Sequence, residues 1–316
     1  MKRLTHILCA TALTLATQTF SQASSLLVSY TSAGGGGIEK FSLSPQTAGT
    51  VFDSENVAVR SVTTANNVAY WSSDTQVFAD SLTDATGGGG KTLLPSIPFA
   101  GVTVTDLAVD VGTNSYLLGW NAPGYGWFVV QYSLAPNSTY TIFSNDTDVV
   151  HGLSVAGNNA YWAEGSSIYS EHLDGTGKAL LQSFTLGAVS INDVAIDSAG
   201  QTYLIGATTP GLPPLIARYP LTPNASGTLF AFATSNVEAL TLAGDRAYWI
   251  DGMSIWSEKL DGTDLTLQET LAAGLTPTDL AVTLDAPAGV PEPESSVTLG
   301  SGLVMLSLLT RRRRKL

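Results

Sequence analysis

The sequence predicts an all-β fold: a six-bladed β-propeller, closed by strand exchange between its two ends and followed by a short C-terminal transmembrane helix. Three observations lead to this prediction. A repeat of about 44 residues, the length of one four-stranded blade, runs through the chain. The first and last repeats are incomplete in complementary ways. Charged residues make up only 13% of the chain, and its 31 glycines favour short strands and turns over helices.

The first type of repeat unit is marked by a Tyr-Trp pair. The pair occurs three times, at intervals of 91 and 87 residues. In the second and third copies, an aromatic strand and a Leu-Asp-Gly-Thr turn follow it, at 173–176 and 260–263. We expect these aromatic side chains to pack between neighbouring blades rather than to bind a ligand. They are Tyr70, Trp71, Tyr161, Trp162, Tyr248 and Trp249.

A second type of unit alternates with the first. Residues 105–110 and 192–197 match one another at a spacing of 87 residues, and each segment leads into a second, Tyr-Leu strand. Two unit types within 87 residues give one unit about every 44 residues. Units two to six are therefore centred on Tyr70, Tyr116, Tyr161, Tyr203 and Tyr248.

The two ends of the repeat region complete one another. Residues 25–30 match the second strand of unit three, so unit one lacks its inner strand. That strand appears at the other end, as residues 278–282. Pairing the two segments would close the ring and remove an exposed sheet edge. A superhelical β-solenoid is the alternative, but it would not need a repeat that begins one strand late.

The Tyr-Trp pairs and the acidic residues after them resemble the YWTD propellers of lipoprotein-receptor type. The segments that carry the resemblance are 70–74, 161–164 and 248–251, together with the Leu-Asp-Gly-Thr turns. The similarity covers residues 25–285, but only blades two, four and six carry the motif. It implies a propeller that binds other macromolecules without chemistry.

The N-terminus has the order of a secretory signal peptide. Met1, Lys2 and Arg3 are followed by an apolar stretch to about Ala16, and 21–23 offers small residues for cleavage. We assign residues 1–23 to this signal and residues 24–286 to the propeller. Export is therefore expected.

The C-terminus has three parts. Residues 287–296 form a proline-rich linker, 297–310 an apolar helix that inserts in the membrane, and 311–316 a basic cytoplasmic tail. This order resembles the PEP-CTERM sorting signal, with Pro291, Glu292 and Pro293 as its motif and Arg311, Arg312, Arg313 and Arg314 as the membrane stop. The resemblance implies processing by an exosortase and then release or attachment outside the cell. A simple membrane anchor is the alternative.

Composition narrows the choice of partners. The one cysteine, Cys9, lies within the signal peptide, so the mature protein has no disulfide. Between residues 24 and 290 there are 7 basic and 24 acidic residues, a net charge of 7 − 24 = −17. Such a surface repels nucleic acids and anionic membranes. It is compatible with neutral sugars, cations or basic partners.

No cofactor is expected from the sequence, and calcium is the alternative, for which four acidic residues are candidate ligands. Asp106, Asp193 and Asp279 recur at one place on the inner strands, and Glu238 lies near that place in another blade. Asn192, Arg60 and His151 would share the same mouth of the central channel. Carboxylate and amide oxygens suit calcium, although Arg60 would oppose it. The alternative is that the regular aspartates accept backbone N–H groups and build the blades.

Two functions follow from these observations. The first is a non-enzymatic propeller of the cell surface or exopolysaccharide matrix, which binds a polysaccharide or a surface protein. The second is a calcium-dependent secreted hydrolase or lactonase that uses the acids at the channel mouth. The sequence contains no Gly-x-Ser-x-Gly, His-Glu-x-x-His or phosphate-loop motif, so we expect no catalytic residue and favour the first function.

Overall fold

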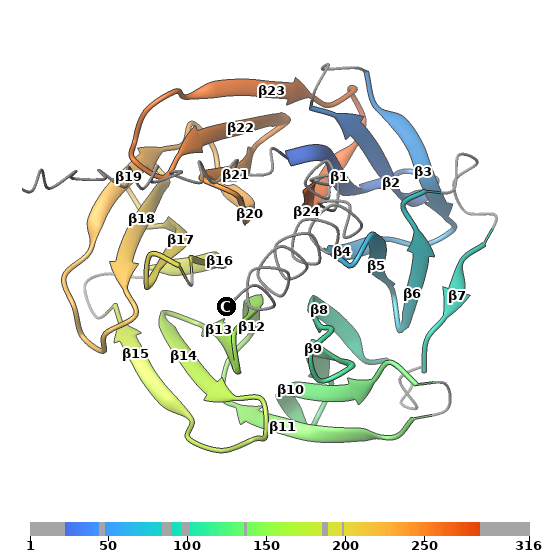
Figure 1. The fold of residues 1–316 in the computed structure, drawn as a ribbon, viewed down its shortest axis with the longest axis horizontal. Helices are drawn as coiled ribbons and strands as arrows, with labels where there is room; N and C mark the ends of the chain where they lie inside the picture. The colour runs from blue at the N-terminus through green and yellow to red at the C-terminus, as the bar shows by residue number, and fades with distance from the viewer. Residues whose placement is uncertain are drawn as a thin grey trace, which may run out of the picture. The chain divides into compact units, whose positions relative to one another are not determined.

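The computed structural model describes residues 23–43, 48–83, 90–95, 101–135, 138–184, 189–197 and 199–284, and every regular element in these ranges is a β-strand. The strands form six antiparallel sheets of four. In Figure 1 the sheets stand around one central axis, each with its first strand toward the centre and its last at the periphery. The six-bladed propeller predicted from the repeat is confirmed.

Each blade contributes one strand to each of four layers. The inner strands are β24 (Thr276–Leu284), β4 (Val59–Ala65), β8 (Thr103–Asp110), β12 (Val150–Ala156), β16 (Ser190–Asp197) and β20 (Val237–Ala243). The second strands are β1 (Ala23–Ser32), β5 (Val68–Ser73), β9 (Ser115–Ala122), β13 (Asn159–Glu164), β17 (Thr202–Thr208) and β21 (Arg246–Asp251). The third strands are β2 (Gly35–Ser42), β6 (Gln76–Ser81), β10 (Gly126–Ser133), β14 (Ser167–His172), β18 (Leu215–Pro220) and β22 (Ser254–Lys259). The outer strands are β3 (Thr50–Glu55), β7 (Thr92–Leu93), β11 (Tyr140–Asp146), β15 (Ala179–Ser183), β19 (Thr228–Phe232) and β23 (Thr266–Thr270).

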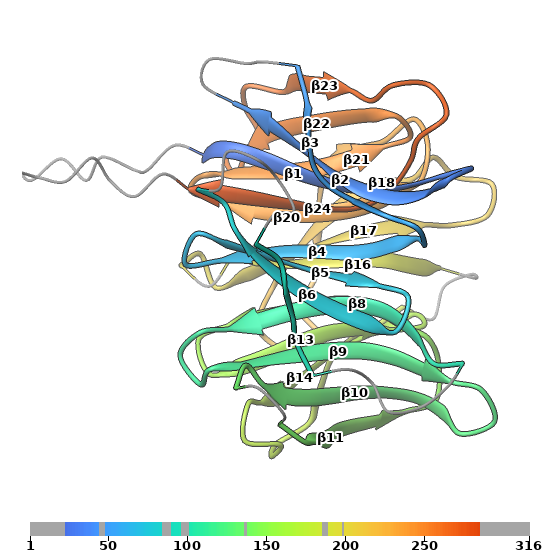
Figure 2. The ribbon, with the colours of Figure 1, turned by 90° about the vertical axis from the view of Figure 1, so that its right-hand side faces the viewer.

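Blade one is closed by strand exchange. The last strand, β24, pairs antiparallel with β1, with Leu26 opposite Val282 and Val28 opposite Leu280. Figure 2 shows the two strands side by side in the same sheet. Pairing with β24 gives β1 a neighbour on its inner side, so β1 is not left as a free edge. This is the pairing that the incomplete first and last repeats predict.

The Tyr-Trp pairs join neighbouring blades. Adjacent residues on a strand point to opposite faces of its sheet. Tyr70 therefore packs with Leu107 and Tyr116 of blade three, while Trp71 packs with Leu27 and Ile38 of blade one. Tyr161 and Trp162 do the same for blades five and three, and Tyr248 and Trp249 for blades one and five. The three tryptophans are fully buried, as a packing role requires.

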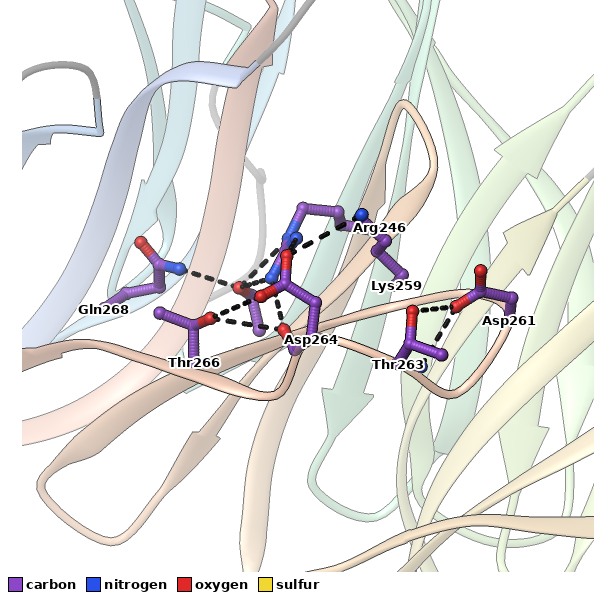
Figure 3. A network of polar contacts seen from close by, with 8 residues as sticks. Arg246, Lys259, Asp261, Thr263, Asp264, Thr266 and Gln268 are labelled. Carbon is purple, nitrogen blue, oxygen red and sulfur yellow. Dashed lines mark hydrogen bonds and ion pairs between the residues drawn. The ribbon is translucent and has the colours of Figure 1, made fainter.

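The Leu-Asp-Gly-Thr turns are held by their own side chains. The Asp261 carboxylate accepts the Thr263 N–H at 3.0 Å, and Asp174 accepts the Thr176 N–H at 3.0 Å. Gly175 and Gly262 supply the left-handed conformation of the turn, with φ of 79° and 81°. Figure 3 shows the turn of blade six beside the ion pair between Arg246 and Asp264. The motif thus builds the blade.

The two ends of the chain carry predictions that lie outside the described residues. The signal peptide, the sorting motif Pro291-Glu292-Pro293, the apolar helix and the membrane stop Arg311–Arg314 all fall there, apart from Ala23, where β1 begins. Within the described ranges, no helix is long and apolar enough to cross a membrane.

Candidate functional site

A cavity of about 410 Å³ opens at one mouth of the central channel. Its walls come from the starts of all six inner strands. The seven residues that the sequence places at this mouth all line it: Arg60, Asp106, His151, Asn192, Asp193, Glu238 and Asp279. A second cavity of about 240 Å³ lies further along the same strands. Asp106, Asp193 and Asp279 border both cavities, so they form a ring between the mouth and the rest of the channel.

A bulge in every blade directs side chains toward the mouth. The pairing of each inner strand with the second strand shifts register at the same place, for example between Val59 and Ser61 and between Val104 and Asp106. The other blades repeat the shift. Residues left unpaired by a bulge are re-aimed relative to the pleat. They include Arg60, Thr105, Asn192, Glu238 and Thr278.

The three aspartates tie the blades together in pairs. Asp279 accepts the N–H of Leu280, next to it, at 2.6 Å and that of Val62 in blade two at 2.8 Å. Asp193 accepts Val194 N–H at 2.7 Å and, across to blade six, Leu240 N–H at 2.5 Å.

Asp106 repeats the pattern from blade three to blade four. It accepts the N–H of Leu107 at 2.7 Å, and it also accepts the N–H of Leu153. Each aspartate therefore links an odd blade to the even blade after it. Accepting backbone N–H groups is the structural role that the regular spacing suggests.

Ser61 joins two of these carboxylates. Its Oγ lies 2.6 Å from Asp106 Oδ1 and 2.6 Å from Asp279 Oδ2. One hydroxyl has a single hydrogen to donate, so hydrogen bonds at both contacts require a proton on one of the two acids. Burial and the charge of Asp106 raise the pKa of Asp279 to about 8. A protonated Asp279 can donate to Ser61, and Ser61 can then donate to Asp106.

Two of the four rim residues are more accessible than the aspartate ring. Arg60 and Glu238 are exposed, while His151 and Asn192 are half-buried. Burial lowers the pKa of His151, with Asp148 opposing the shift, so the imidazole is neutral at pH 7 and can both donate and accept. Partial desolvation in the mouth raises the pKa of Glu238. The rim thus offers one cation, one acid and two uncharged donor–acceptor groups.

The predicted calcium ligands share this cavity but do not form a ligand set. In the part of the chain that the structure describes, no group of three or more His, Cys, Asp and Glu side chains could hold a metal ion. Both oxygens of Asp106, Asp193 and Asp279 already accept backbone N–H groups. Glu238 lies on the rim, in the same cavity as the cationic Arg60.

The acidic residue after the Tyr-Trp pair does not occupy the same place in all three even blades. Glu164 and Asp251 end their strands and accept the backbone N–H groups of Thr147 and Thr234 at 2.6 and 2.7 Å. In blade two the matching strand end is Ser73, because Ser73 faces Gln76 as Asp251 faces Ser254. Asp74 lies one residue further on, in the turn, at a φ of 55°. Asp74 therefore follows the Tyr-Trp pair, as the sequence indicates, but one residue beyond the place of Glu164 and Asp251.

Comparison with known proteins supports the fold. The chain is similar to one in the crystal structure of a nidogen/laminin complex, with a TM-score of 0.66 and 14% identity over 82% of this chain and 98% of that one. TolB from Acinetobacter baumannii gives a TM-score of 0.64 and 11% identity over 82% and 66% of the two chains. A putative TolB from Agrobacterium tumefaciens gives 0.62 and 11% over 82% and 92%. No protein-family model and no curated protein sequence matches the chain.

Proposed function

We propose that this protein is an exported, non-enzymatic β-propeller of the cell surface or extracellular matrix, which binds a hydroxyl-rich polysaccharide at the channel mouth. One observation carries the proposal. Arg60, His151 and Glu238 converge with Asn192 on one open cavity, while the aspartates beneath them are held by backbone N–H groups. The accessible groups are therefore suited to binding, and the inner acids to building the ring.

The rim has the chemistry that recognises a neutral sugar. Each sugar hydroxyl both donates and accepts a hydrogen bond. Arg60 donates, Glu238 accepts, and Asn192 and the neutral His151 can do both. One cation and one acid leave the rim without a large charge of either sign. A cavity of about 410 Å³ lies within the range of small-molecule sites.

A surface protein is the second class of partner. The neighbour from the nidogen/laminin complex comes from an assembly of two different proteins. That similarity is one of fold alone, at 14% identity. A protein partner of this propeller is therefore an outcome that the binding test has to separate from a polysaccharide.

The binding test compares rim variants on a panel of neutral and acidic polysaccharides. Glu238→Gln and Arg60→Ala should each weaken binding of a neutral polysaccharide at least tenfold, with an unchanged melting temperature because both side chains are exposed. Lys259→Ala, a half-exposed lysine on the outer part of blade six, is the control and should bind normally.

Two results would contradict this proposal. If no polysaccharide binds but a cell-surface protein does, the ligand class is wrong. If calcium raises the melting temperature and Glu238→Gln abolishes that effect, the hydrolase alternative gains support. Activity on lactones and esters should then be sought.

Export and sorting form the other part of the proposal, and they rest on residues 1–23 and 287–316. An exosortase would process the protein near Pro291-Glu292-Pro293, after transient insertion of the apolar helix in the inner membrane. The intact mass of protein from its native host should lack both ends. A mass that includes Arg311–Arg314 would instead indicate a permanent anchor.

A further inference from the structure

Blade three contains a further cavity, away from the channel, that the repeat does not explain. It has a volume of about 310 Å³ and lies between the start of β8, the β9–β10 turn and the outer strand β11. Four aromatic side chains line it, Trp120, Tyr125, Phe128 and Tyr140, together with aliphatic residues that include Val102 and Ile142. No charged side chain is among its lining residues in the described part of the chain.

The aromatic walls are specific to this blade. Blade five follows blade three at a constant spacing of 87 residues, and there Trp120, Phe128 and Tyr140 become Ala207, Leu215 and Gly227. The register agrees, because Trp120 faces Phe128 as Ala207 faces Leu215.

Blade one also lacks most of these aromatic side chains. Its residues at these places are Tyr30, Gly37 and Gly49, and Tyr30 faces Gly37. A Cβ at Gly49 would lie 2.4 Å from the Phe41 ring, and one at Gly227 would lie 2.3 Å from the Tyr219 ring. The glycine in those blades makes room for an aromatic ring of the third strand. Blade five therefore forms without any of the three rings, and blade one forms with a single ring, Tyr30, at the place of Trp120.

The rings form a continuous series that leads from the core to the cavity. Tyr116 and Tyr132 stack at 5.2 Å in the buried part of the blade. Tyr132 contacts Tyr140 at 5.8 Å, Tyr140 contacts Trp120 at 5.4 Å, and Trp120 contacts Phe128 edge-on at 6.3 Å. Aromatic rings prefer such tilted and edge-on contacts. A ligand ring in the cavity would continue the series.

The apolar surface extends beyond the cavity. Tyr125 is 84% exposed at the tip of the β9–β10 turn, and Ile142 is 55% exposed on the outer strand. The turn is ordered, since Tyr125 N–H donates to the Ala122 carbonyl at 2.9 Å and Gly124 adopts a φ of 83°. A small molecule in the cavity would leave these two side chains in water. A protein segment would cover them.

We propose that this cavity is a second binding site, which takes the aromatic side chain of a protein partner. The partner segment carries basic residues beside the aromatic one, because residues 24–290 have a net charge of 7 − 24 = −17. The site is separate from the channel mouth and does not depend on polysaccharide binding. Aromatic anchors that enter an apolar pocket, with polar residues around them, are typical of protein interfaces.

Short peptides can test the site in the propeller itself. The probes are acetyl-Lys-Phe-Lys-amide, acetyl-Lys-Ala-Lys-amide, acetyl-Glu-Phe-Glu-amide and p-cresol, and the readout is the NMR shift of the Trp120 indole N–H. We expect the Lys-Phe-Lys peptide to bind at least tenfold more tightly than the other three. Tyr140→Gly, which installs the residue of blades one and five, should weaken its binding at least tenfold.

Tyr125→Ala and Leu212→Ala form a matched pair, which keeps the test decisive if Tyr140→Gly lowers the melting temperature. Leu212 is the residue 87 positions after Tyr125 and is 61% exposed. Tyr125→Ala should weaken binding, and Leu212→Ala should not. Equal binding of the Lys-Ala-Lys peptide, or equal losses in the two variants, would overturn the site. Equal binding of p-cresol would overturn the protein partner, and equal binding of the Glu-Phe-Glu peptide its basic character.

Discussion

The odd and even blades of this propeller have the same four strands but contact their neighbours through different residues. Blades one, three and five carry the aspartates at the channel, and each aspartate accepts a backbone N–H from the next even blade. Blades two, four and six carry the Tyr-Trp pairs, whose side chains pack against the odd blade on either side. The odd blades therefore supply the hydrogen-bonding aspartates between blades, and the even blades supply the aromatic Tyr-Trp side chains.

The difference indicates that the structural unit is a pair of blades, present three times. The aspartates link blades one to two, three to four and five to six. Between the pairs, packing of the Tyr-Trp residues continues around the ring. Two places depart from this threefold pattern: Ser61, which bridges two aspartates, and the aromatic cavity of blade three. Such departures are where a function is most easily distinguished from a repeated structural role.

Among the substitutions, the largest effect should come from breaking one aspartate link. Asp193→Asn replaces one carboxylate oxygen by an NH₂ group, which faces a backbone N–H that needs an acceptor. Because Val194 and Leu240 are buried, that N–H cannot donate to a water molecule instead. We expect a loss of about 2–3 kcal/mol in the free energy of unfolding, measured by urea denaturation.

Asp251→Asn sharpens the comparison, because Asp251 is an even-blade acid that also accepts two backbone N–H groups, at 2.7 and 2.6 Å. Its donors, Thr234 and Ser235, lie in a loop and are exposed or half-buried, so water can replace it. The expected loss is about 1 kcal/mol. Equal losses for Asp193→Asn and Asp251→Asn would show that the aspartate hydrogen bonds at the channel contribute no more to stability than those in an outer loop.

Most of the fold could be predicted from the sequence because residues with the same structural role recur at the same place in successive blades. The Tyr-Trp pairs, the inner aspartates and the Leu-Asp-Gly-Thr turns each mark a fixed place in a blade, so their spacing gives the number of blades. The lone strand at 278–282 could be predicted as the partner of β1, because the first blade at the N-terminal end lacks its inner strand. The sequence shows that Asp74 comes one residue later than Glu164 and Asp251, but only the strand register shows that Ser73 takes their place.

The candidate site was predictable only in part. The rim residues and the aspartates were found because they occupy equivalent positions, which a repeat brings to one mouth. Ser61 gave no such signal, since its counterparts are Gly152 and Ala239 and its bridge depends on two strands distant in sequence. The cavity of blade three was missed for a similar reason. Trp120, Phe128 and Tyr140 look like ordinary core residues until the same places in blades one and five are compared.

The aspartate ring should also make the stability of the folded protein depend on pH. Asp279 has a pKa of about 8 in the folded protein, against an ordinary value of 3.8, and the pKa values of Asp106 and Asp193 are raised as well. Between these pH values the folded chain holds a proton that the unfolded chain has released. The stability from this group is therefore full below about pH 4 and is lost as the pH rises through about 8. We expect the free energy of unfolding to fall from pH 5 to pH 8.

Two variants test the cause through the NMR titration of the Asp279 carboxyl carbon, and they move its pKa in opposite directions. Asp106→Asn removes the neighbouring charge, so the pKa of Asp279 should fall, because that charge is one of the causes that raise it. Ser61→Ala keeps every charge but removes a hydrogen bond that favours the carboxylate, so the pKa should rise. The methyl group is tolerated at this place, where blade six has Ala239. A fall of the pKa in both variants would instead mean that Ser61 mainly accepts from protonated Asp279, because its removal would then cost a hydrogen bond of the protonated form.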